Sequence, residues 1–473
     1  MFSESRPMPD GIGSIHFIGI GGVGMSGIAL VAHDRGLKVS GSDLKESRAT
    51  AALREAGIEV FIGQSPENVA GRAIDVVVVS SAIPPDNPEL AALVDRGVPV
   101  WARARMLAWL GRGRKTLAVA GTHGKTTTSS MLATSLVRLG ADPTFLIGGV
   151  VDGYDTNASS GAGEHYVVEA DESDGSFVYL DPYVAVITNI EEDHLDHYAD
   201  LAAIRTAFRE FAGAHQGDGV VIVCGDDPQL PELAHATGRK VLTYGFSGDC
   251  DIVCSDIVHE GVHTRFDVRV AGDAPASVRL DSNPGEHNVL NATAVMAVLS
   301  FLGYGVAEAA EAVSGFTGVR RRFDFVGNVA GIDVVDDYGH HPTEVAATIK
   351  AACELGYRHV HVLFQPHRYS RTQALAGEWG PAFDRADSVT FMDVYSAGEA
   401  PIPGVSGKTL VDSVLAHDPC MQVAWMPHRG DVAPYLAQHL VPGDLLLTMG
   451  AGDITAMGPV VLDMLQHEGS VVR

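Results

Sequence analysis

The sequence lacks any run of about 18 consecutive apolar residues, the length that a helix needs to cross a membrane. Its first residues, MFSESRPMPDGIGS, also lack the basic stretch and apolar run of a secretory signal. We therefore expect a cytoplasmic protein with no insertion into the membrane.

Basic residues and cysteines are scarce. Lys and Arg number 33 against 59 Asp and Glu, which gives a formal net charge of −26. Binding to the nucleic-acid backbone needs a surplus of Lys and Arg, so we expect no nucleic-acid partner. The five cysteines are irregularly spaced without a Cys-x-x-Cys pair, which favours reduced thiols over a zinc site or disulfides.

Glycine and apolar residues are plentiful: 53 of the 473 residues are Gly, and 46% are hydrophobic. At roughly 100–200 residues per domain, the length predicts about three domains. Short apolar runs alternate with glycine-rich turns and helical patterns, which is typical of α/β folds with parallel sheets. We expect α/β domains over residues 1–113, 114–324 and 325–473, of which the first and third have a Rossmann-like fold and the central one a fold of the P-loop type.

The first turn, Gly19–Gly24, joins a strand expected over 15–20 to a helix expected over 25–34. Its glycines fit the pattern Gly-x-Gly-x-x-Gly, and Asp43 follows about 20 residues later. Such a turn lets the backbone approach a diphosphate at a helix N-terminus. The glycines do not distinguish NAD from another diphosphate, and a turn without ligand is the alternative.

The second loop, residues 121–127, reads GTHGKTT between a strand and a helix. It departs from the strict P-loop pattern, because Val119 stands where that pattern has Gly. Lys125 can place its charge against phosphates, and the Thr126 hydroxyl can bind Mg²⁺. A turn without ligand explains this combination poorly.

Two acidic clusters follow later strands. One is EADESDG at 169–175, and the other is NIEEDHLDH at 189–197. Beside a phosphate loop they suit a metal ion, whereas either cluster alone would indicate a solvated acidic face.

Three further polar stretches are candidates for ligand contacts. His287, Asn288 and Asn291 either cap a helix running to about residue 301 or face a nucleotide. The stretches DDYGHH at 336–341 and FQPHRYSR at 364–371 suit an anionic ligand or a structural ion-pair network.

With these motifs in order, the chain resembles the Mur ligase family over almost its full length. The resemblance rests on GIGGVGMSGIA, GTHGKTTT, EADESDGSF, NIEEDHLDHY, PGEHNVLNA, RRFD, VDDYGHHPTE, FQPHRYSRT and DVYSAGE. The shorter phosphate loop of that family accounts for Val119.

The resemblance implies an ATP-dependent ligase that joins L-alanine to the carboxylate of UDP-N-acetylmuramate in peptidoglycan precursor synthesis. ATP converts the carboxylate into an acyl phosphate, the amine attacks, and ADP and phosphate are released. The implied cofactor is Mg²⁺ or Mn²⁺, and the implied partners are these small molecules, bound by a monomer or weak homodimer.

The family motifs also imply roles for individual residues. Those implied for UDP-substrate binding are Gly19, Gly21, Gly22, Val23, Gly24, Met25, Ser26, Asp43, Ser80, Ser81 and His123. Those implied for ATP binding are Gly121, Thr122, His123, Gly124, Lys125, Thr126, Thr127, His287, Asn288, Asn291, Arg322 and Asp337. Those implied for amino-acid binding are Tyr338, His340, His367, Arg368 and Arg371. The implied metal ligands are Thr126, Glu169 and His194, and the implied catalytic residues are Lys125, Glu169, His194 and Arg322.

Three alternatives stay open. A related recycling ligase attaches a whole tripeptide to the same UDP-sugar, although its first turn tends to differ. An NAD-dependent oxidoreductase would use residues 19–43 to bind its cofactor, but it would give Lys125 no role. A non-catalytic nucleotide-binding scaffold would bind ATP without turnover. The sequence does not choose among L-alanine, glycine and L-serine, nor between His340 and His194 as the base.

Overall fold

The structure is a computed structural model that describes residues 11–80, 82–194, 197–214 and 216–471. Contacts divide the chain into two compact units. Unit 1 comprises Met1–Cys254, Val268–Ala276 and Leu290–Phe316, and unit 2 comprises Ser255–Asp267, Ser277–Val289 and Thr317–Arg473. The strands of the described residues form three sheets, two of them purely or mainly parallel with helices between the strands, as the sequence predicts.

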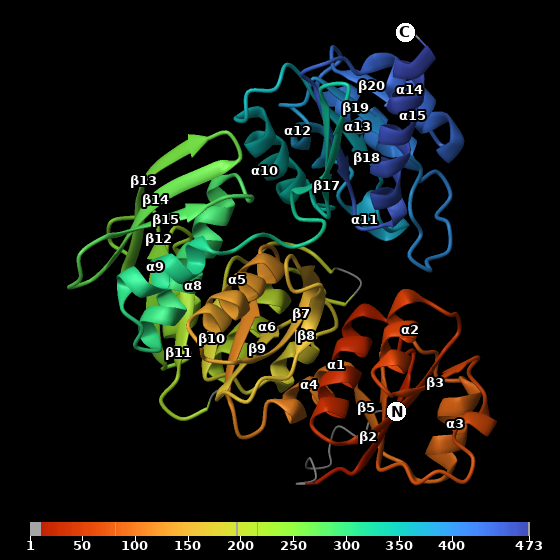
Figure 1. Cartoon of the computed structure of the whole chain (residues 1–473), viewed down its shortest axis with the longest axis vertical. Helices are drawn as coiled ribbons and strands as arrows, with labels where there is room; N and C mark the ends of the chain where they lie inside the picture. The colour runs from red at the N-terminus through yellow and green to blue at the C-terminus, as the bar shows by residue number, and fades with distance from the viewer. Residues whose placement is uncertain (1–10, 81, 195–196, 215, 472–473) are drawn as a thin grey trace. The chain divides into compact units, whose positions relative to one another are not determined.

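The first sheet lies in unit 1, in the part of the chain drawn red to orange in Figure 1. It has five parallel strands in the order β3-β2-β1-β4-β5. The strands are β1 (Ser14–Ile18), β2 (Lys38–Asp43), β3 (Glu59–Ile62), β4 (Val76–Val79) and β5 (Val100–Ala102). The helices between and after them are α1 (Val23–Asp34), α2 (Arg48–Glu55), α3 (Pro88–Asp95) and α4 (Arg103–Leu110). β1 and β4 are almost entirely buried, which explains their continuous apolar sequence.

The second sheet has ten strands in the order β15-β14-β13-β12-β11-β10-β6-β9-β7-β8. Its strands are β6 (Lys115–Ala120), β7 (Thr144–Val151), β8 (Thr156–Ser159), β9 (His165–Glu169), β10 (Val184–Ile187), β11 (Val220–Cys224), β12 (Lys240–Gly245), β13 (Ile252–Glu260), β14 (His263–Val270) and β15 (Ala276–Leu280). The associated helices are α5 (Lys125–Arg138), α6 (Leu201–Gly213), α7 (Gln229–His235), α8 (Glu286–Phe301) and α9 (Val306–Ser314). β6 pairs in parallel with β10 and β9, so the second loop follows a strand in the interior of the sheet.

Helix α1 packs on the hairpin of β7 and β8 within unit 1. A Cβ on Gly27 would lie 3.0 Å from the Cβ of Ala158, which is closer than ordinary van der Waals contact, so a larger residue there would have to displace the hairpin. The Asn157 side-chain amide donates to the Val23 carbonyl at 3.1 Å. The hairpin therefore contacts the helix that begins in the first turn.

The third sheet lies in unit 2, with strand order β16-β17-β21-β18-β19-β20. Its strands are β16 (Asp324–Val329), β17 (Ile332–Asp337), β18 (Val360–Phe364), β19 (Ser388–Phe391), β20 (Gln422–Trp425) and β21 (Leu445–Met449). Its helices are α10 (Pro342–Cys353), α11 (Tyr369–Ala374), α12 (Trp379–Ala382), α13 (Gly407–His417), α14 (Arg429–His439) and α15 (Met457–Val471). β16 is antiparallel to β17, and the other paired neighbours are parallel.

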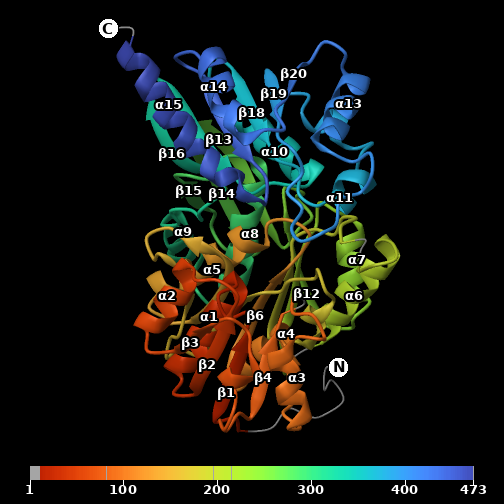
Figure 2. The same cartoon turned by 90° about the vertical axis from the view of Figure 1, so that its right-hand side faces the viewer.

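Two apolar cores cover the faces of the third sheet. One contains residues of α10, α12 and α13, and the other contains residues of α14 and α15. Figure 2 shows α14 and α15 on one side of β18 and β19 and α13 on the other. Helices thus cover both faces of the sheet, while Asp337 lies at the end of β17 and His367 follows β18.

All five cysteines are free thiols. Among the described residues, we find no helix with the length and apolar character that a membrane span requires.

Candidate functional site

The second loop joins buried β6 to α5, which begins at Lys125. Gly124 caps the helix in the left-handed region with φ of 83°. A Cβ at this position would lie 2.5 Å from Oδ1 of Asn291, so both the backbone conformation and the neighbouring side chain require glycine. The backbone amides at the start of α5 form the kind of helix N-terminus that binds phosphate.

Lys125 is fixed by three oxygen atoms. Its Nζ donates to the carbonyls of Gly121 at 2.6 Å and Thr122 at 3.2 Å, and to Oε1 of Glu172 at 2.9 Å. Burial acts to lower the pKa of Lys125, but the nearby carboxylates, led by Glu172, outweigh it and raise that pKa. The ammonium therefore stays charged at the N-terminus of α5.

Glu172 is a buried carboxyl whose side chain is 3% exposed. Burial raises its pKa to about 7, against the opposing effect of Lys125. Its Oε2 atom accepts no hydrogen bond from the residues that the structure describes. This pairing with Lys125 is not predicted from the sequence, although Glu172 belongs to the first acidic cluster.

The implied metal ligands lie on both sides of this carboxyl. The Thr126 hydroxyl donates to Oε1 of Glu169 at 3.1 Å, and the Gly148 amide donates to Oε2 of Glu169 at 2.8 Å. Nε2 of His194 lies 3.6 Å from Oε1 of Glu172. A hydroxyl, carboxylates and an imidazole suit a divalent ion such as Mg²⁺ or Mn²⁺, and the unpartnered Oε2 of Glu172 leaves an acceptor for it.

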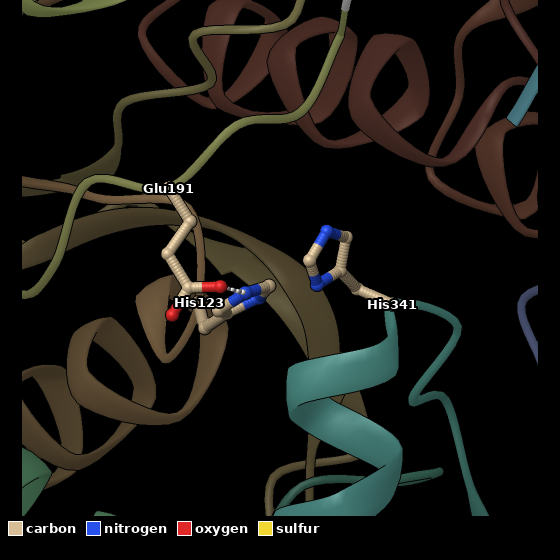
Figure 3. Close-up of side chains that lie close together, drawn as sticks. All are labelled: His123, Glu191 and His341. Atoms are coloured by element: carbon tan, nitrogen blue, oxygen red, sulfur yellow. Dashed lines mark hydrogen bonds and ion pairs between the residues drawn. The ribbon is translucent and has the colours of Figure 1, made fainter. Parts of the chain in front are cut away.

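The backbone of the second loop is held by residues after β10. The Thr188 hydroxyl and the Asn189 side-chain amide donate to the His123 carbonyl at 2.6 and 3.0 Å. The His123 imidazole faces the Glu191 carboxylate, with Nε2 and Oε2 3.3 Å apart (Figure 3). The third side chain drawn in Figure 3, His341, belongs to unit 2. Sequence analysis assigns no role to Asn189, the first residue of the second acidic cluster, or to Thr188, which precedes it.

The first turn borders a pocket of about 320 Å³ in unit 1. Among the residues implied for UDP-substrate binding, its lining includes Gly19, Gly22, Val23, Gly24, Met25 and Ser80. Glu169 and Asp171 line the same pocket, together with Leu146, Ile147, Gly148 and Asn157. The pocket therefore extends from the first turn to Glu169, the carboxylate that accepts a hydrogen bond from Thr126 at the start of α5.

Arg103, at the start of α4, is a pocket residue that sequence analysis misses. A Cβ on Gly24 would lie 2.9 Å from its Nη1, and its Nη2 donates to Oδ2 of Asp171 at 2.9 Å. Burial acts to raise the pKa of Asp171, but Arg103 and Lys125 outweigh it and lower that pKa. The only sequence signal was a basic residue directly after a strand end.

Of the other residues implied for UDP-substrate binding, the described Gly21, Ser26, Asp43 and His123 are not part of the pocket lining. Asp43 accepts a hydrogen bond from the Gly21 amide at 2.9 Å, which ties the end of β2 to the first turn. The Ser26 hydroxyl donates to the Val23 carbonyl at 3.1 Å. Ser81 lies outside the described residues.

In unit 2, the residues implied for amino-acid binding form a row of rings. The His340 ring centroid is 5.4 Å from Tyr338 and 5.8 Å from His367, and His367 stacks on Tyr395 at 5.7 Å. Nη1 of Arg371 lies 3.3 Å from Nδ1 of His367. The row extends from the end of β17 to the segments after β18 and β19, and Tyr395 is a member that sequence analysis does not predict.

Arg368 adjoins this row in an unusual backbone conformation. Its φ is 67°, its amide donates to the Tyr395 carbonyl at 2.9 Å, and its Nε lies 3.9 Å from Oε1 of Glu399. A non-glycine residue in the left-handed region carries strain that the surrounding contacts must offset.

Two basic residues cover the ring of Tyr338. The guanidinium carbons of Arg321 and Arg322 lie 4.9 and 5.1 Å from its centroid. Nε of Arg321 donates to Oδ2 of Asp336 at 3.0 Å, whereas Nη1 of Arg322 lies 3.7 Å from Oε1 of Glu344. Arg322 is therefore the less tightly bound of the two.

Asp337 is buried and already accepts hydrogen bonds from the amides of Gly339 at 2.7 Å and Phe323 at 2.9 Å. Burial raises its pKa to about 6, opposed by Arg322 and by these amides. Its carboxylate thus organises the turn that carries Tyr338.

Helix α8 begins at Glu286, so His287 and Asn288 lie in its first turn. The Asn288 side-chain amide donates to the Pro284 carbonyl at 3.1 Å, and its nitrogen lies 3.0 Å from Nε2 of His287. Both residues belong to unit 2, whereas Asn291 belongs to unit 1 and approaches Gly124. The side chains of His287 and Asn288 thus bond within the start of α8, whereas Asn291 lies beside the phosphate loop.

Comparison with known protein families identifies three successive matches. Residues 14–115 match the Mur ligase family catalytic domain, 119–299 the Mur ligase middle domain, and 321–452 the Mur ligase glutamate ligase domain. The chain is 46% identical over 472 residues to a UDP-N-acetylmuramate–L-alanine ligase of Acidothermus cellulolyticus, and the match covers 98% of each chain.

Solved structures of similar ligases have the same overall fold. The UDP-N-acetylmuramate–alanine ligase of Thermotoga maritima superposes with a TM-score of 0.78 at 31% identity, covering 96% of this chain and 99% of that one. A murein peptide ligase of Psychrobacter arcticus gives a TM-score of 0.71 at 27% identity, again covering 96% and 99%. The predicted three-domain α/β architecture is thereby confirmed, and the chain belongs to the Mur ligase family.

Proposed function

We propose that this chain is an ATP-dependent ligase that joins L-alanine to the carboxylate of UDP-N-acetylmuramate in peptidoglycan precursor synthesis. The similarity over the full length to ligases of that name supports the choice of substrates. The observation that carries the chemistry is the second loop, where a charged Lys125 stands at the N-terminus of α5 beside Thr126 and Glu169.

Each substrate has a proposed place. The pocket beside the first turn would hold the UDP-substrate, with Arg103 added to the residues implied by the motifs. The second loop and Asn291 would hold the ATP phosphates, with His287, Asn288, Arg322 and Asp337 serving the rest of the nucleotide. The ring row around His340 and His367 would hold the amino acid, and Arg371 would meet its carboxylate.

The reaction divides into two steps. A carboxylate oxygen attacks the γ-phosphorus of ATP, and ADP leaves with the electron pair of the broken bond. The amine nitrogen then attacks the acyl carbon, loses a proton, and expels phosphate. Lys125 would stabilise the charge that develops on the transferred phosphoryl group by position alone, because its ammonium is already fixed by three oxygens.

The proposed metal site uses Thr126, Glu169 and His194, with Mg²⁺ or Mn²⁺ as the ion. When bound, such an ion neutralises phosphate charge. The Gly148 amide orients Glu169, and the Thr126 hydroxyl turns toward the same carboxylate.

We also propose domain boundaries at residues 113 and 324 and a monomer or weak homodimer. Because ATP and UDP-sugars are cytoplasmic metabolites, the proposed place of reaction is the cytoplasm. Limited proteolysis would test the boundaries, and sedimentation would test the oligomeric state.

The function is tested by ADP release with ATP, Mg²⁺ and UDP-N-acetylmuramate, with and without L-alanine. We expect ADP only when both acceptor and amino acid are present. ADP that appears only with a tripeptide would assign the recycling ligase instead. ATP binding without turnover by any amine would leave a scaffold, and NAD reduction would assign an oxidoreductase.

A further inference from the structure

Two histidines and an aspartate meet at the edge of the third sheet where its parallel strands begin. His359 directly precedes β18, His361 is its second residue, and Asp444 directly precedes β21. Residues two apart on a strand point to the same face, so the two imidazoles share one face. Because Val360 pairs with Leu445 in the parallel register, Asp444 is the neighbour of His359 on the adjacent strand.

The three side chains converge on one point. Nδ1 of His359 lies 2.9 Å from Oδ1 of Asp444, and Nε2 of His361 lies 3.1 Å from its Oδ2. One ligand atom of each residue falls within 4.8 Å of the other two. The Asp444 side chain is fully buried, while the His361 and His359 side chains are 14% and 40% exposed. The carboxylate of the cluster is therefore buried, whereas the two imidazoles are partly accessible to solvent.

The surrounding contacts already orient the ligands. Nδ1 of His361 lies 2.7 Å from the Ser388 hydroxyl, and the Val441 amide donates to Oδ2 of Asp444 at 2.9 Å. In metal sites, a ligating histidine commonly uses its other ring nitrogen for such a contact, and this fixes the ring. Burial acts to raise the pKa of Asp444, but the Val441 amide and both histidines outweigh it and lower that pKa, so the carboxylate is ionised.

The second nitrogen of each ring also has a place for a hydrogen bond when the first binds a metal ion. Nδ1 of His361 faces the Ser388 hydroxyl, which can accept as well as donate. The His359 side chain is 40% exposed, so its Nε2 can donate to water.

We propose that His359, His361 and Asp444 form a binding site for a borderline transition-metal ion such as Zn²⁺, with water in the remaining coordination position. Two imidazoles and one carboxylate are the donors that such ions prefer, whereas Mg²⁺ and Ca²⁺ sites are built mainly from oxygen ligands. The site lies at the amino ends of the strands, while Asp337 and His367 lie at or after the carboxyl ends of β17 and β18. The ion would therefore link β18 to β21 and take no part in catalysis.

Chelator-treated full-length protein, titrated with Co²⁺ and followed by its visible absorption, tests this proposal. The comparison includes His359→Asn and His361→Gln, together with His417→Asn as the matched control. Nε2 of His417 lies 2.9 Å from Oδ1 of Asp384, and the 45% exposed side chain resembles His359 in having a carboxylate partner. Co²⁺ ions bound at the proposed magnesium site would contribute the same absorption in all four proteins.

We expect the wild type and the control to bind one Co²⁺ that each site variant loses or binds at least about tenfold more weakly. Zn²⁺ should displace this Co²⁺ and should raise the melting temperature of the wild type and the control more than that of the variants. Equal binding by wild type and both site variants would overturn the proposal, as would an equal loss in the control. Because His361→Gln retains polar contacts, it keeps the test valid if His359→Asn alters folding, which melting without metal would reveal.

Discussion

The first turn and the second loop both join a buried parallel strand to a helix N-terminus in unit 1, but they obtain positive charge differently. The second loop carries its own cation, and Lys125 is fixed by two carbonyls of the loop and by Glu172. The first turn has no basic residue, and Arg103 reaches it from the start of α4.

This difference matches two tasks. A loop that transfers a phosphoryl group needs a cation whose position changes little during the reaction, because charge develops at a fixed place. A turn that only binds a diphosphate can use a cation from another segment. The comparison therefore predicts that changes in the second loop affect turnover, whereas changes near the first turn affect substrate affinity.

Lys125→Ala should have the largest effect. We expect ADP formation to fall by at least about 10²–10³-fold, as when a preorganised charge donor is removed elsewhere, while UDP-substrate binding persists. Steady-state kinetics and calorimetric titration measure the two quantities. Lys115→Ala is the control, since this 41% exposed side chain pairs with Glu164 at the start of β6. Full turnover by Lys125→Ala would contradict the assigned role of the second loop.

Gly124→Ala should rank next. The left-handed backbone costs an alanine about 1–2 kcal/mol, and its Cβ would also press on Asn291. The control is Gly140→Ala, with φ of 72° and no atom within 4 Å of the new Cβ. We expect urea unfolding to show the larger loss for Gly124→Ala, with a raised KM for ATP in that variant alone. Equal effects of the two substitutions would show that the Asn291 side chain can move aside without a loss of stability or a change in the KM for ATP.

Arg103→Met should weaken UDP-substrate binding and leave the KM for ATP close to that of the wild type. A hydrogen bond to a charged group contributes about 1.5–3 kcal/mol, so the KM for the UDP-substrate should rise about 10–100-fold. Arg112→Met, an exposed change shortly after α4, serves as the control. A fall in kcat at unchanged KM would place Arg103 in the phosphoryl-transfer step. It would contradict the proposed difference between the first turn and the second loop.

Glu172→Gln should have the smallest effect on turnover, because the amide oxygen of glutamine can still accept the hydrogen bond from Lys125, and its main effect should be on the pH dependence of stability. Because burial raises the pKa of Glu172 from 4.5 to about 7, the folded chain holds a proton that the unfolded chain releases in that range. Its contribution to stability is therefore present below pH 4.5 and is lost as the pH rises through about 7. Urea titrations at several pH values should show that the free energy of unfolding falls less steeply with pH in the variant than in the wild type.

The control for this pH dependence is Glu164→Gln. Hydrogen bonding to Lys115 lowers the pKa of this exposed carboxyl, so its small contribution has the opposite sign and disappears as the pH falls. Identical pH profiles for wild type and Glu172→Gln would contradict the raised pKa.

Local sequence predicts much of the fold because buried parallel strands are continuous apolar runs and the turns after them are rich in glycine. The helix ending at Phe301 is confirmed, whereas α1 begins at Val23 rather than the expected Met25. The expected bound is wrong because extended Gly22 caps the helix within the first turn, so the glycine pattern overlaps the helix.

Site residues were predicted where they are consecutive in the chain. The sequence places Lys125 and Thr126 in one loop, but it does not show that Glu172 pairs with that lysine or that Arg103 reaches Gly24. Those contacts depend on how strands far apart in sequence are ordered in a sheet, which local patterns do not encode. Tyr395 was missed for the same reason, since its ring meets His367 only through adjacent β18 and β19.

The contact between α1 and the β7–β8 hairpin has a consequence for protein engineering. Gly27 meets Ala158, and Asn157 bonds to Val23, so the helix that starts at the first turn is fitted to a hairpin encoded more than a hundred residues later. A chimaera that exchanges only residues 1–113 would join a foreign helix to this hairpin. Residues 144–159 should be exchanged together with residues 1–113, because the surfaces of α1 and the hairpin fit each other although they are far apart in the chain.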